Sequence, residues 1–212
     1  MKYERPVTPA EHSPAIAALC AELCPSVTPK YIDVLPLPGA LPNECFPLVA
    51  KHIEKQGGTQ VIGWSIWEFP GLFVEAEFHC VLRNRDGELV DITPKRIPSA
   101  RIYFVQDYVR EYRGVQVNNV RRPLTADPLL RRYLRGFDER FEIMNAGERI
   151  NQHGAVMLSG QEVARMEAID AEGYEAFLHL RSKLPEIGAY SPCPCGSGKK
   201  AKWCHRATYG GA

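Results

Sequence analysis

The sequence lacks long hydrophobic runs, internal repeats, low-complexity tracts and an excess of charge of either sign. No stretch approaches the ~18 consecutive apolar residues of a membrane-spanning helix, and residues 1–6 lack the apolar region of a signal peptide. A formal net charge of +1 over 212 residues gives no general reason to expect binding to nucleic acid or membranes. We therefore expect a cytoplasmic protein with no membrane segment, whose thiols stay reduced.

Length and composition fit an ordinary globular protein. A chain of 212 residues with 45% hydrophobic and 24% charged residues suits one medium domain with a small appendage, or two small domains. In a reducing compartment its seven cysteines are ligands, nucleophiles or core residues rather than disulfide partners. Three of them lie in the last 20 residues, and the others are Cys20, Cys24, Cys45 and Cys80.

The first half of the chain predicts two helices followed by a small antiparallel sheet. Residues 8–24 read as a helix that begins at a Thr8–Glu11 capping box. The segment 25–43 is rich in proline and reads as irregular, and Asn43 is a suitable N-cap for a helix over about 44–56. Strands are predicted over 60–68, 72–83, 88–92 and 101–106, with a hairpin turn at 84–87.

The remainder reads as helical. Apolar side chains recur at helical spacing over 127–145, and a second helix is predicted over 160–184. The predicted fold class is α+β, with a Cys-bearing helix packed on a small antiparallel sheet, C-terminal helices and a small zinc-binding tail. The corresponding parts are an α+β core over 1–126, a helical extension packed on it over 127–186, and a zinc module over 191–207.

The tail carries four residues with the spacing Cys-x-Cys-x8-Cys-His: Cys193, Cys195, Cys204 and His205. Four nitrogen and sulfur ligands suit tetrahedral Zn²⁺. A segment this short cannot bury enough apolar area to fold alone, and metal binding supplies roughly 10–16 kcal/mol in comparable zinc peptides. We therefore predict one zinc ion on these four residues.

The run from Pro192 to His205 also resembles the SEC-C motif, which ends the bacterial preprotein translocase ATPase SecA and is attached to many other bacterial proteins. The resemblance implies zinc binding by the same four residues and docking on a protein partner. Nothing else in the chain resembles SecA, since it has no phosphate-binding loop. Lysines and an arginine around the motif favour an acidic protein surface or RNA, or simply form a solvated face.

A second group of residues suggests cysteine chemistry. Cys45 is placed at the second position of the helix over 44–56, where unpaired N–H groups and the helix dipole lower a thiol pKa. His79 ends an alternating strand, and Asp91 lies on the strand that returns after the 84–87 turn. A bulge at this turn would put both side chains on one face, so that Asp91 orients His79 and His79 serves Cys45 as base.

This order of elements resembles the transglutaminase-like branch of the papain-type fold, over roughly residues 41–92. The resemblance implies Cys45 as nucleophile, His79 as general base and acid, and Asp91 as the residue that orients the imidazole. Phe46 stands where transglutaminases often have Trp, and Cys80 follows His79 where Ala is common, which leaves the substrate open. The same three residues also suit purely structural roles, in the core or at a turn.

Other groups of residues have alternative interpretations. Glu75, Glu77 and His79 share a strand face and are an alternative metal site, although their ~13 Å span disfavours convergence on one ion. Cys20 and Cys24 lie one helical turn apart and suit core packing better than metal binding. Six arginines fall in 113–135 against one acidic residue, which fits phosphate or an acidic partner, or a solvated helix face with ion pairs.

Two functional hypotheses follow from these observations. The first is a zinc-binding protein whose core is a cysteine-dependent hydrolase or acyl transferase acting on an amide or thioester, with the zinc tail recruiting a protein target. The second is a non-catalytic adaptor that uses the zinc tail and the arginine-rich helix to bind protein or ribonucleoprotein. Direct nucleic-acid binding through the arginines is a third and weaker hypothesis.

Overall fold

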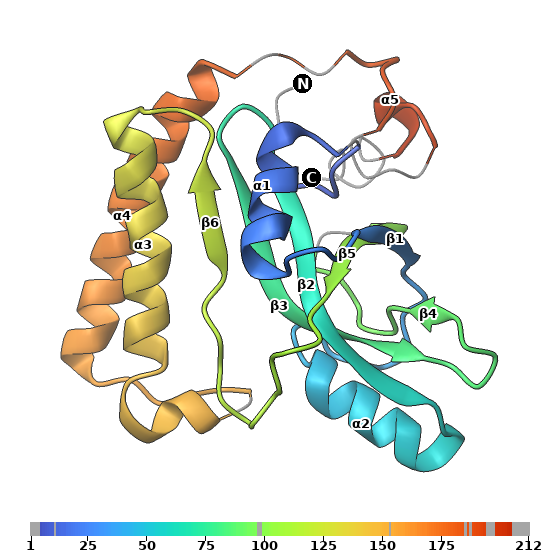
Figure 1. Ribbon diagram of the computed structural model, residues 1–212. Coiled ribbons are helices and arrows are strands. Elements are labelled where there is room, and N and C mark those ends of the chain that lie inside the picture. Colours follow the sequence, from blue (N-terminus) through green and yellow to red (C-terminus); the bar gives the residue numbers. More distant parts are fainter. Residues whose placement is uncertain are drawn as a thin grey trace.

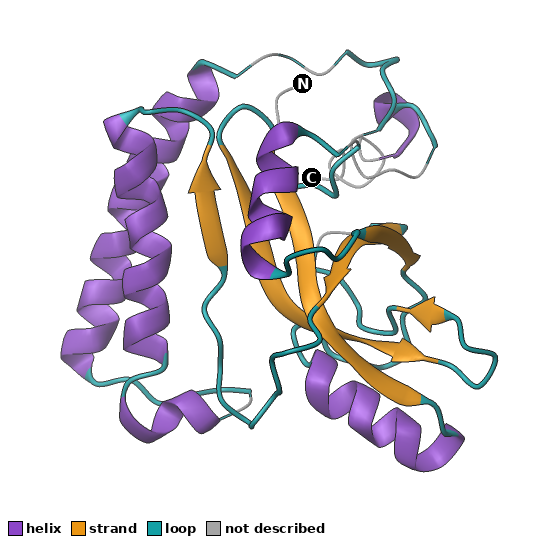
Figure 2. Cartoon of the chain, in the orientation of Figure 1, coloured by secondary structure: helices purple, strands orange, loops and turns teal. Residues whose placement is uncertain are grey.

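One antiparallel sheet forms the centre of the protein, and helices cover one of its faces and one of its ends (Figures 1 and 2). The computed structural model describes residues 5–10, 12–96, 99–152, 154–184, 186, 188–193 and 198–204. The elements in chain order are α1 (Pro14–Leu23), β1 (Lys30–Asp33), α2 (Cys45–Gln56), β2 (Thr59–Phe69), β3 (Phe73–Arg83), β4 (Leu89–Val90), β5 (Arg101–Gln106), β6 (Val120–Pro123), α3 (Pro128–Met144), a 3-10 turn (Gly147–Asn151), α4 (Gly160–Ser182) and α5 (Ala201–Cys204). The predicted α+β class is confirmed.

The sheet is nearly closed. Its strand order is β1-β5-β2-β3-β4, and β2 and β3 form a long hairpin that pairs from Thr59↔Arg83 to Phe69↔Phe73. A parallel bridge between Val34, just after β1, and Asp91, just after β4, joins the two ends of the strand order. The Asp91 N–H donates to the Asp33 carbonyl over 2.9 Å, so the backbone of Asp91 is fixed where the sheet closes.

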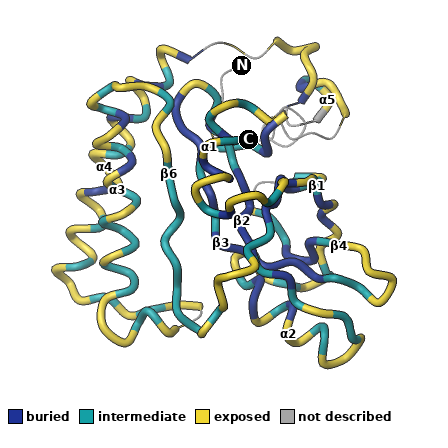
Figure 3. The backbone as a smooth tube through the Cα atoms, viewed as in Figure 1, coloured by how far each residue is buried: buried dark blue, intermediate teal, exposed yellow. Residues whose placement is uncertain are grey.

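The two faces of the sheet have different neighbours. One face packs against α1 and α2 in the main core, which includes Val74, Ala76, Phe78 and Cys80 from alternate positions of β3. The other face, which the curled sheet encloses, carries a smaller apolar cluster formed by Ile32, Val34, Val61, Val81, Ile102 and Phe104. The alternation predicted for β3 is therefore confirmed, and Figure 3 shows the burial of both central strands.

The outer edge of β3 is left open in its middle. On this edge β6 pairs with Phe73–Ala76 and β4 pairs with Leu82 and Arg83. Within the described part of the chain, neither strand covers residues 77–81. The N-terminus of α2 lies against this region, because Cys45 and Phe46 belong to the same core cluster as Phe78 and Cys80.

The helices α3 and α4 pack side by side against the far end of the β2–β3 hairpin (Figure 1). Their apolar stripes meet the hairpin in a second core of buried residues: Phe69, Leu72, Phe73, Leu130, Leu134, Leu180 and Leu184. Asp127 caps α3 through a 2.9 Å bond from the Leu129 N–H, and Ser159 forms a capping box with Glu162 at the start of α4. Both predicted helices are confirmed.

The first helix begins later than the sequence predicts. Its N-cap is Ser13, not Thr8, and the capping box expected at residue 8 is not formed. The Thr8 hydroxyl instead donates to the Arg101 carbonyl over 2.8 Å, and Val7 forms a bridge to Glu68. Residues near Thr8 therefore run along the sheet, because the edge of the sheet offers backbone hydrogen-bond partners that these residues could not reach from a helix.

The cap expected for α2 is also wrong. Asn43 has a left-handed backbone with φ +67°, and the N-cap is Glu44, whose side chain makes no cap hydrogen bond. The Asn43 side-chain oxygen, with its amide oriented to satisfy both groups, accepts from Arg96 Nε over 3.2 Å. Cys45 is consequently the first residue of α2 rather than the second.

Two short strands were absent from the expected set. Strand β1 lies inside the proline-rich segment that the sequence assigned to irregular structure, and it pairs with β5 from Lys30↔Phe104 to Asp33↔Arg101. Strand β6 precedes α3 and pairs with β3. No helix among the described residues has both the length and the apolar character needed to cross a membrane.

Candidate active site and zinc tail

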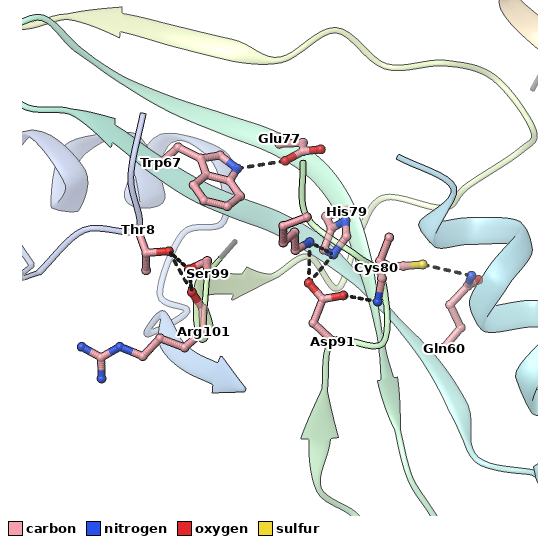
Figure 4. Close-up of polar contacts among 11 residues, drawn as sticks. Thr8, Gln60, Trp67, Glu77, His79, Cys80, Asp91, Ser99 and Arg101 are labelled. Atoms are coloured by element: carbon pink, nitrogen blue, oxygen red, sulfur yellow. Dashed lines mark hydrogen bonds and ion pairs between the residues drawn. The ribbon is translucent and has the colours of Figure 1, made fainter. Parts of the chain in front are cut away.

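A buried histidine and a buried aspartate meet beside the open edge of β3 (Figure 4). His79 Nε2 lies 3.0 Å from Asp91 Oδ2, and the two residues are 2% and 0% exposed. The second carboxylate oxygen, Oδ1, accepts from the Thr93 N–H over 2.9 Å. Lys95 Nζ lies 2.5 Å from Asp91 Oδ2 and 3.2 Å from His79 Nε2.

The fold explains why this contact forms. The register Leu82↔Val90 extends to place position 91 opposite Val81, so Asp91 reaches His79 diagonally, from the same face of the sheet. His79 and Asp91 therefore share a face of the sheet, as predicted, although they do not lie directly opposite each other as the turn suggested. The bridge to Val34 holds Asp91 from its other side, which fixes the carboxylate independently of the His79 contact.

Cys45 completes the group from the N-terminus of α2. Its side chain is buried, with 6% of the residue exposed. A side-chain hydrogen bond with Cys80 lowers the pKa of the Cys45 thiol well below its usual value, and the charge and side chain of His79 lower this pKa further, against the opposing effect of burial. Burial and the neighbouring Cys45 raise the pKa of Cys80, which therefore stays a protonated donor.

The electrostatics of the group favour a charged pair. Burial and the Lys95 ammonium lower the pKa of His79, but the charges of Asp91 and Cys45 outweigh them and raise it to about 10. Burial raises the pKa of Asp91, but His79 and Lys95 outweigh this effect and hold the pKa well below its usual range. At neutral pH the arrangement therefore favours a Cys45 thiolate beside a His79 imidazolium.

A cavity of about 540 Å³ opens onto these side chains. Cys45, His79, Thr93 and Lys95 line one part of it. The other lining residues include Asn43, Phe46, Trp67, Glu75, Glu77, Phe78, Arg96, Gln116, Val117, Asn119, Phe141 and Asn145. A small molecule or an extended peptide segment fits a cavity of this size.

Sequence reasoning missed two contributors to the site. Lys95 contacts both Asp91 and His79, and its position four residues after Asp91 was the available signal. Cys80 contributes through the Cys45 thiol, although it lies on the opposite face of β3 from His79. Cys45 interacts with residues of both faces because α2 begins at the edge of the strand rather than above one face.

The alternative metal site on the β3 face is not formed. Glu75 is paired with Arg121 over 2.9 Å and accepts from Asn119 over 2.6 Å, and Glu77 accepts from Trp67 Nε1 over 2.9 Å. No group of three or more His, Cys, Asp or Glu side chains among the described residues is arranged to hold a metal ion. The side chains of Glu75, Glu77 and His79 thus have separate protein partners.

Many of the arginines within residues 113–135 form ion pairs with aspartate or glutamate side chains. Arg121 pairs with Glu75 and Asp138, Arg122 with Glu22, and Arg132 with Glu172. Further ion pairs between α3 and α4 are Arg140–Asp170 and Arg165–Glu139. The pairs between α3 and α4 agree with a solvated helix face with ion pairs, one of the interpretations given for this segment, whereas the Arg121–Glu75 pair lies between strands and is largely buried.

The two cysteines of α1 and its C-cap are core residues. Cys20 and Cys24 are 2% and 5% exposed, and burial raises their pKa values to about 11 and about 12. Such thiols are poor nucleophiles at neutral pH.

The tail is described in part. Cys193 is buried at 5% exposure, and its N–H donates to the Lys199 carbonyl over 2.7 Å. Pro192 and Lys200 form an antiparallel bridge, and α5 follows, with Cys204 as its last residue. Cys195 and His205, and the side chain of Cys204, lie outside the described residues, so the zinc site stays a prediction.

Comparison with known proteins finds short matches to SecA. The chain is 51% identical over 39 residues to protein translocase subunit SecA 1 of Bordetella avium, which covers 18% of this chain and 4% of that protein. It is 50% identical over 36 residues to SecA of Bordetella petrii, and 62% identical over 26 residues to SecA of Bordetella pertussis.

These matches span 17% and 12% of this chain, and 4% and 3% of the two proteins. No family model matches the chain, and no solved structure matches it. The short matches are consistent with a SEC-C motif and suggest an interaction module of that type.

Proposed function

We propose that the core is a cysteine-dependent hydrolase or acyl transferase that acts on an amide or a thioester. The observation that carries the proposal is the buried His79–Asp91 pair beside a thiol of lowered pKa, with Cys45 and His79 lining one cavity. Perturbed ionisable groups with a charge partner in a cavity are typical of functional sites. The order of the three residues along the chain, and the elements that carry them, resemble the transglutaminase-like branch and support the proposal.

The chemistry assigns one step to each side chain. The Cys45 thiolate attacks the substrate carbonyl and forms a carbon–sulfur bond, while the carbonyl electrons move to oxygen. The first N–H groups of α2, those of Cys45 and Phe46, have no intrahelical acceptor and stabilise this oxyanion. His79 gives its proton to the departing amine or thiol, and the acyl group stays on Cys45 as a thioester.

A second step releases the product. His79, now neutral, takes a proton from water or from an acceptor amine, which attacks the thioester and frees the Cys45 thiolate. Because Asp91 holds Nε2, the nitrogen of His79 left for both proton transfers is Nδ1. Asp91 orients the ring and stabilises its charged form, and it does not need to accept the proton.

Mass-resolved alkylation tests this proposal. Iodoacetamide at pH 6 should modify Cys45 far faster than Cys20, Cys24 or Cys80, and His79→Ala should reduce the rate at Cys45 strongly. The matched control is His52→Ala, a histidine of α2 outside the cavity lining. A Cys45 that titrates like a free thiol near pH 8.5 would overturn the proposal.

We also propose that Cys193, Cys195, Cys204 and His205 bind one Zn²⁺ and that the tail docks on a protein. The buried Cys193, its backbone hydrogen bond to Lys199 and the short matches to SecA support this part. The zinc content of the purified protein should be about one ion per chain, and Cys193→Ser should remove it. Cys24→Ser is the control, and unchanged zinc in Cys193→Ser would contradict the assignment.

A non-catalytic adaptor is the second candidate. It is favoured by the exposed aromatic rings of Tyr190 and Trp203, each with Lys200 and Lys202 nearby, on the segment that forms the tail. In cells, Cys45→Ala separates the two functions. If the variant retains full function while Cys193→Ser loses it, the adaptor is favoured; if both lose function, the enzyme is favoured.

A further inference from the structure

One carboxylate that lines the cavity, that of Glu77, has no counter-charge among the described residues. Glu77 lies two residues before His79 on the same face of β3, and both side chains line the cavity. Within the described part of the chain, no Lys, Arg or His side chain pairs with Glu77. Its hydrogen-bond partner is the Trp67 indole, whose Nε1–H donates to Oε2 over 2.9 Å (Figure 4).

Among the described residues, most of the other charges of the cavity are balanced by ion pairs. Glu75 is neutralised by Arg121, which pairs with Asp138 as well. Asp91 is neutralised by Lys95 and His79. Arg96 also lines the cavity; it is exposed, and the neutral Asn43 side chain accepts its hydrogen bonds. Glu77 is therefore the fixed negative charge that a ligand beside His79 would meet.

A second observation points to a polar ligand in the same cavity. Thr93 lines the cavity and is 1% exposed, and its buried side-chain hydroxyl has no hydrogen-bond partner among the described residues. Leaving such a group unsatisfied is unfavourable. A polar atom of a bound substrate would satisfy it.

We propose that the acyl group taken by this site carries an alkylammonium, which binds against the Glu77 carboxylate beside the Trp67 ring. This inference rests on the proposed function and names its substrate class. Alternate residues of a strand are ~6.6 Å apart, so the cation sits roughly that far from the carbonyl beside His79. A lysine side chain spans about this distance from its ammonium to its own carbonyl, which makes a lysyl acyl group a suitable substrate.

Thiol-reactive compounds that differ in charge test the proposal without knowledge of the substrate. The probes are methanethiosulfonates that carry an ethylammonium, a hydroxyethyl or an ethylsulfonate group, and the readout is the mass-resolved rate of modification of Cys45. We expect the ratio of the cationic to the neutral rate to be about tenfold higher at Cys45 than at a small thiol in solution. A fixed charge at this range gives an effect of this size.

The variants isolate the carboxylate. Glu77→Gln should reduce the ratio of the cationic to the neutral rate to that of a small thiol, and Glu77→Lys should favour the anionic reagent. Glu54→Gln removes an equal charge from an exposed position of α2 and should leave the ratio unchanged. Unfolded chains would react with the ratio of a small thiol, so the reversed preference expected of Glu77→Lys is the outcome that loss of folded protein cannot produce.

The outcomes separate the two proposals. Fast reaction of Cys45 with the neutral reagent but no cationic preference would overturn the substrate class and leave the cysteine chemistry intact. A preference that survives Glu77→Gln would also overturn it, since another group would then supply the charge. If Cys45 reacts slowly with all three reagents at pH 6, the proposed function falls, and this inference falls with it.

Discussion

Replacing Asp91 with Asn removes the charge that stabilises the imidazolium while leaving the shape of the side chain nearly unchanged. Asp91 Oδ2 lies 3.0 Å from His79 Nε2 and 2.5 Å from Lys95 Nζ. In Asp91→Asn the Lys95 ammonium stays 3.2 Å from His79 Nε2 with no carboxylate between them. Both changes lower the pKa of His79, since Asp91 raises that pKa and Lys95 lowers it.

The size of the effect follows from the shift. The pKa of His79 rises from 6.5 to about 10. A shift of this size corresponds to roughly 5 kcal/mol of preference for the charged ring. Without Asp91 we expect the His79 pKa to return to about 6.5 or lower, so that most of the imidazolium is lost at pH 7. The Cys45 thiolate then loses its counter-charge, and its reaction rate at pH 6 should fall by about tenfold or more.

The assay is the pH dependence of Cys45 alkylation by iodoacetamide between pH 4 and 10, followed by mass-resolved peptides. Asp86→Asn, in the exposed 84–87 turn, is the control for an aspartate away from the site. Lys95→Met gives a test of opposite sign, because loss of the ammonium should raise the pKa of His79 further. A pH profile unchanged by Asp91→Asn would refute the charged-pair account of this site.

Three further predictions concern stability. Leu130→Ala, in the second core, should lower the free energy of unfolding by about 2–5 kcal/mol in urea titrations, and Leu178→Ala, at a position 44% exposed, by much less. Gly63→Ala should cost about 1–3 kcal/mol or more, because a Cβ at Gly63 would lie 2.2 Å from the Val105 carbonyl oxygen; Gly160→Ala meets open space and should not destabilise. Because the pKa of Asp91 is lowered in the folded protein, its carboxylate stabilises the fold fully above pH ~3.9, and this stabilisation is lost as the pH falls further. Asp91→Asn should therefore reduce the free energy of unfolding less at pH 3 than at pH 7. An equal reduction at both pH values would contradict the ion pairing.

The long elements of the fold were predictable because their patterns are local. The β2–β3 hairpin has a clear alternation, and α3 and α4 have apolar stripes of helical period with good caps. Strands β1 and β6 are four residues each, and β6 ends in Pro123. Their pairing is decided by free edges of β5 and β3, which no short window of sequence contains.

The candidate site was partly predictable for the same reason. His79 and Asp91 are joined by one hairpin, so their contact depends on twelve residues of chain and a turn with Gly87 at φ +85°. The cap of α2 was not predictable, because Asn43 is drawn into a left-handed conformation and its side chain binds Arg96. That contact arises from a loop far along the chain.

The open edge of β3 explains why the site lies where it does. A continuous strand against residues 77–81 would occupy the space that the N-terminus of α2 takes. Strand β4 is short, and directly after it the chain leaves β3 so that Asp91 forms a bridge with Val34. This change of partner opens the edge of β3 and also fixes Asp91 beside His79. The incomplete pairing therefore both admits the Cys45 thiol and positions its partners, and lengthening β4 should separate the thiol from the imidazole even if every site residue is kept.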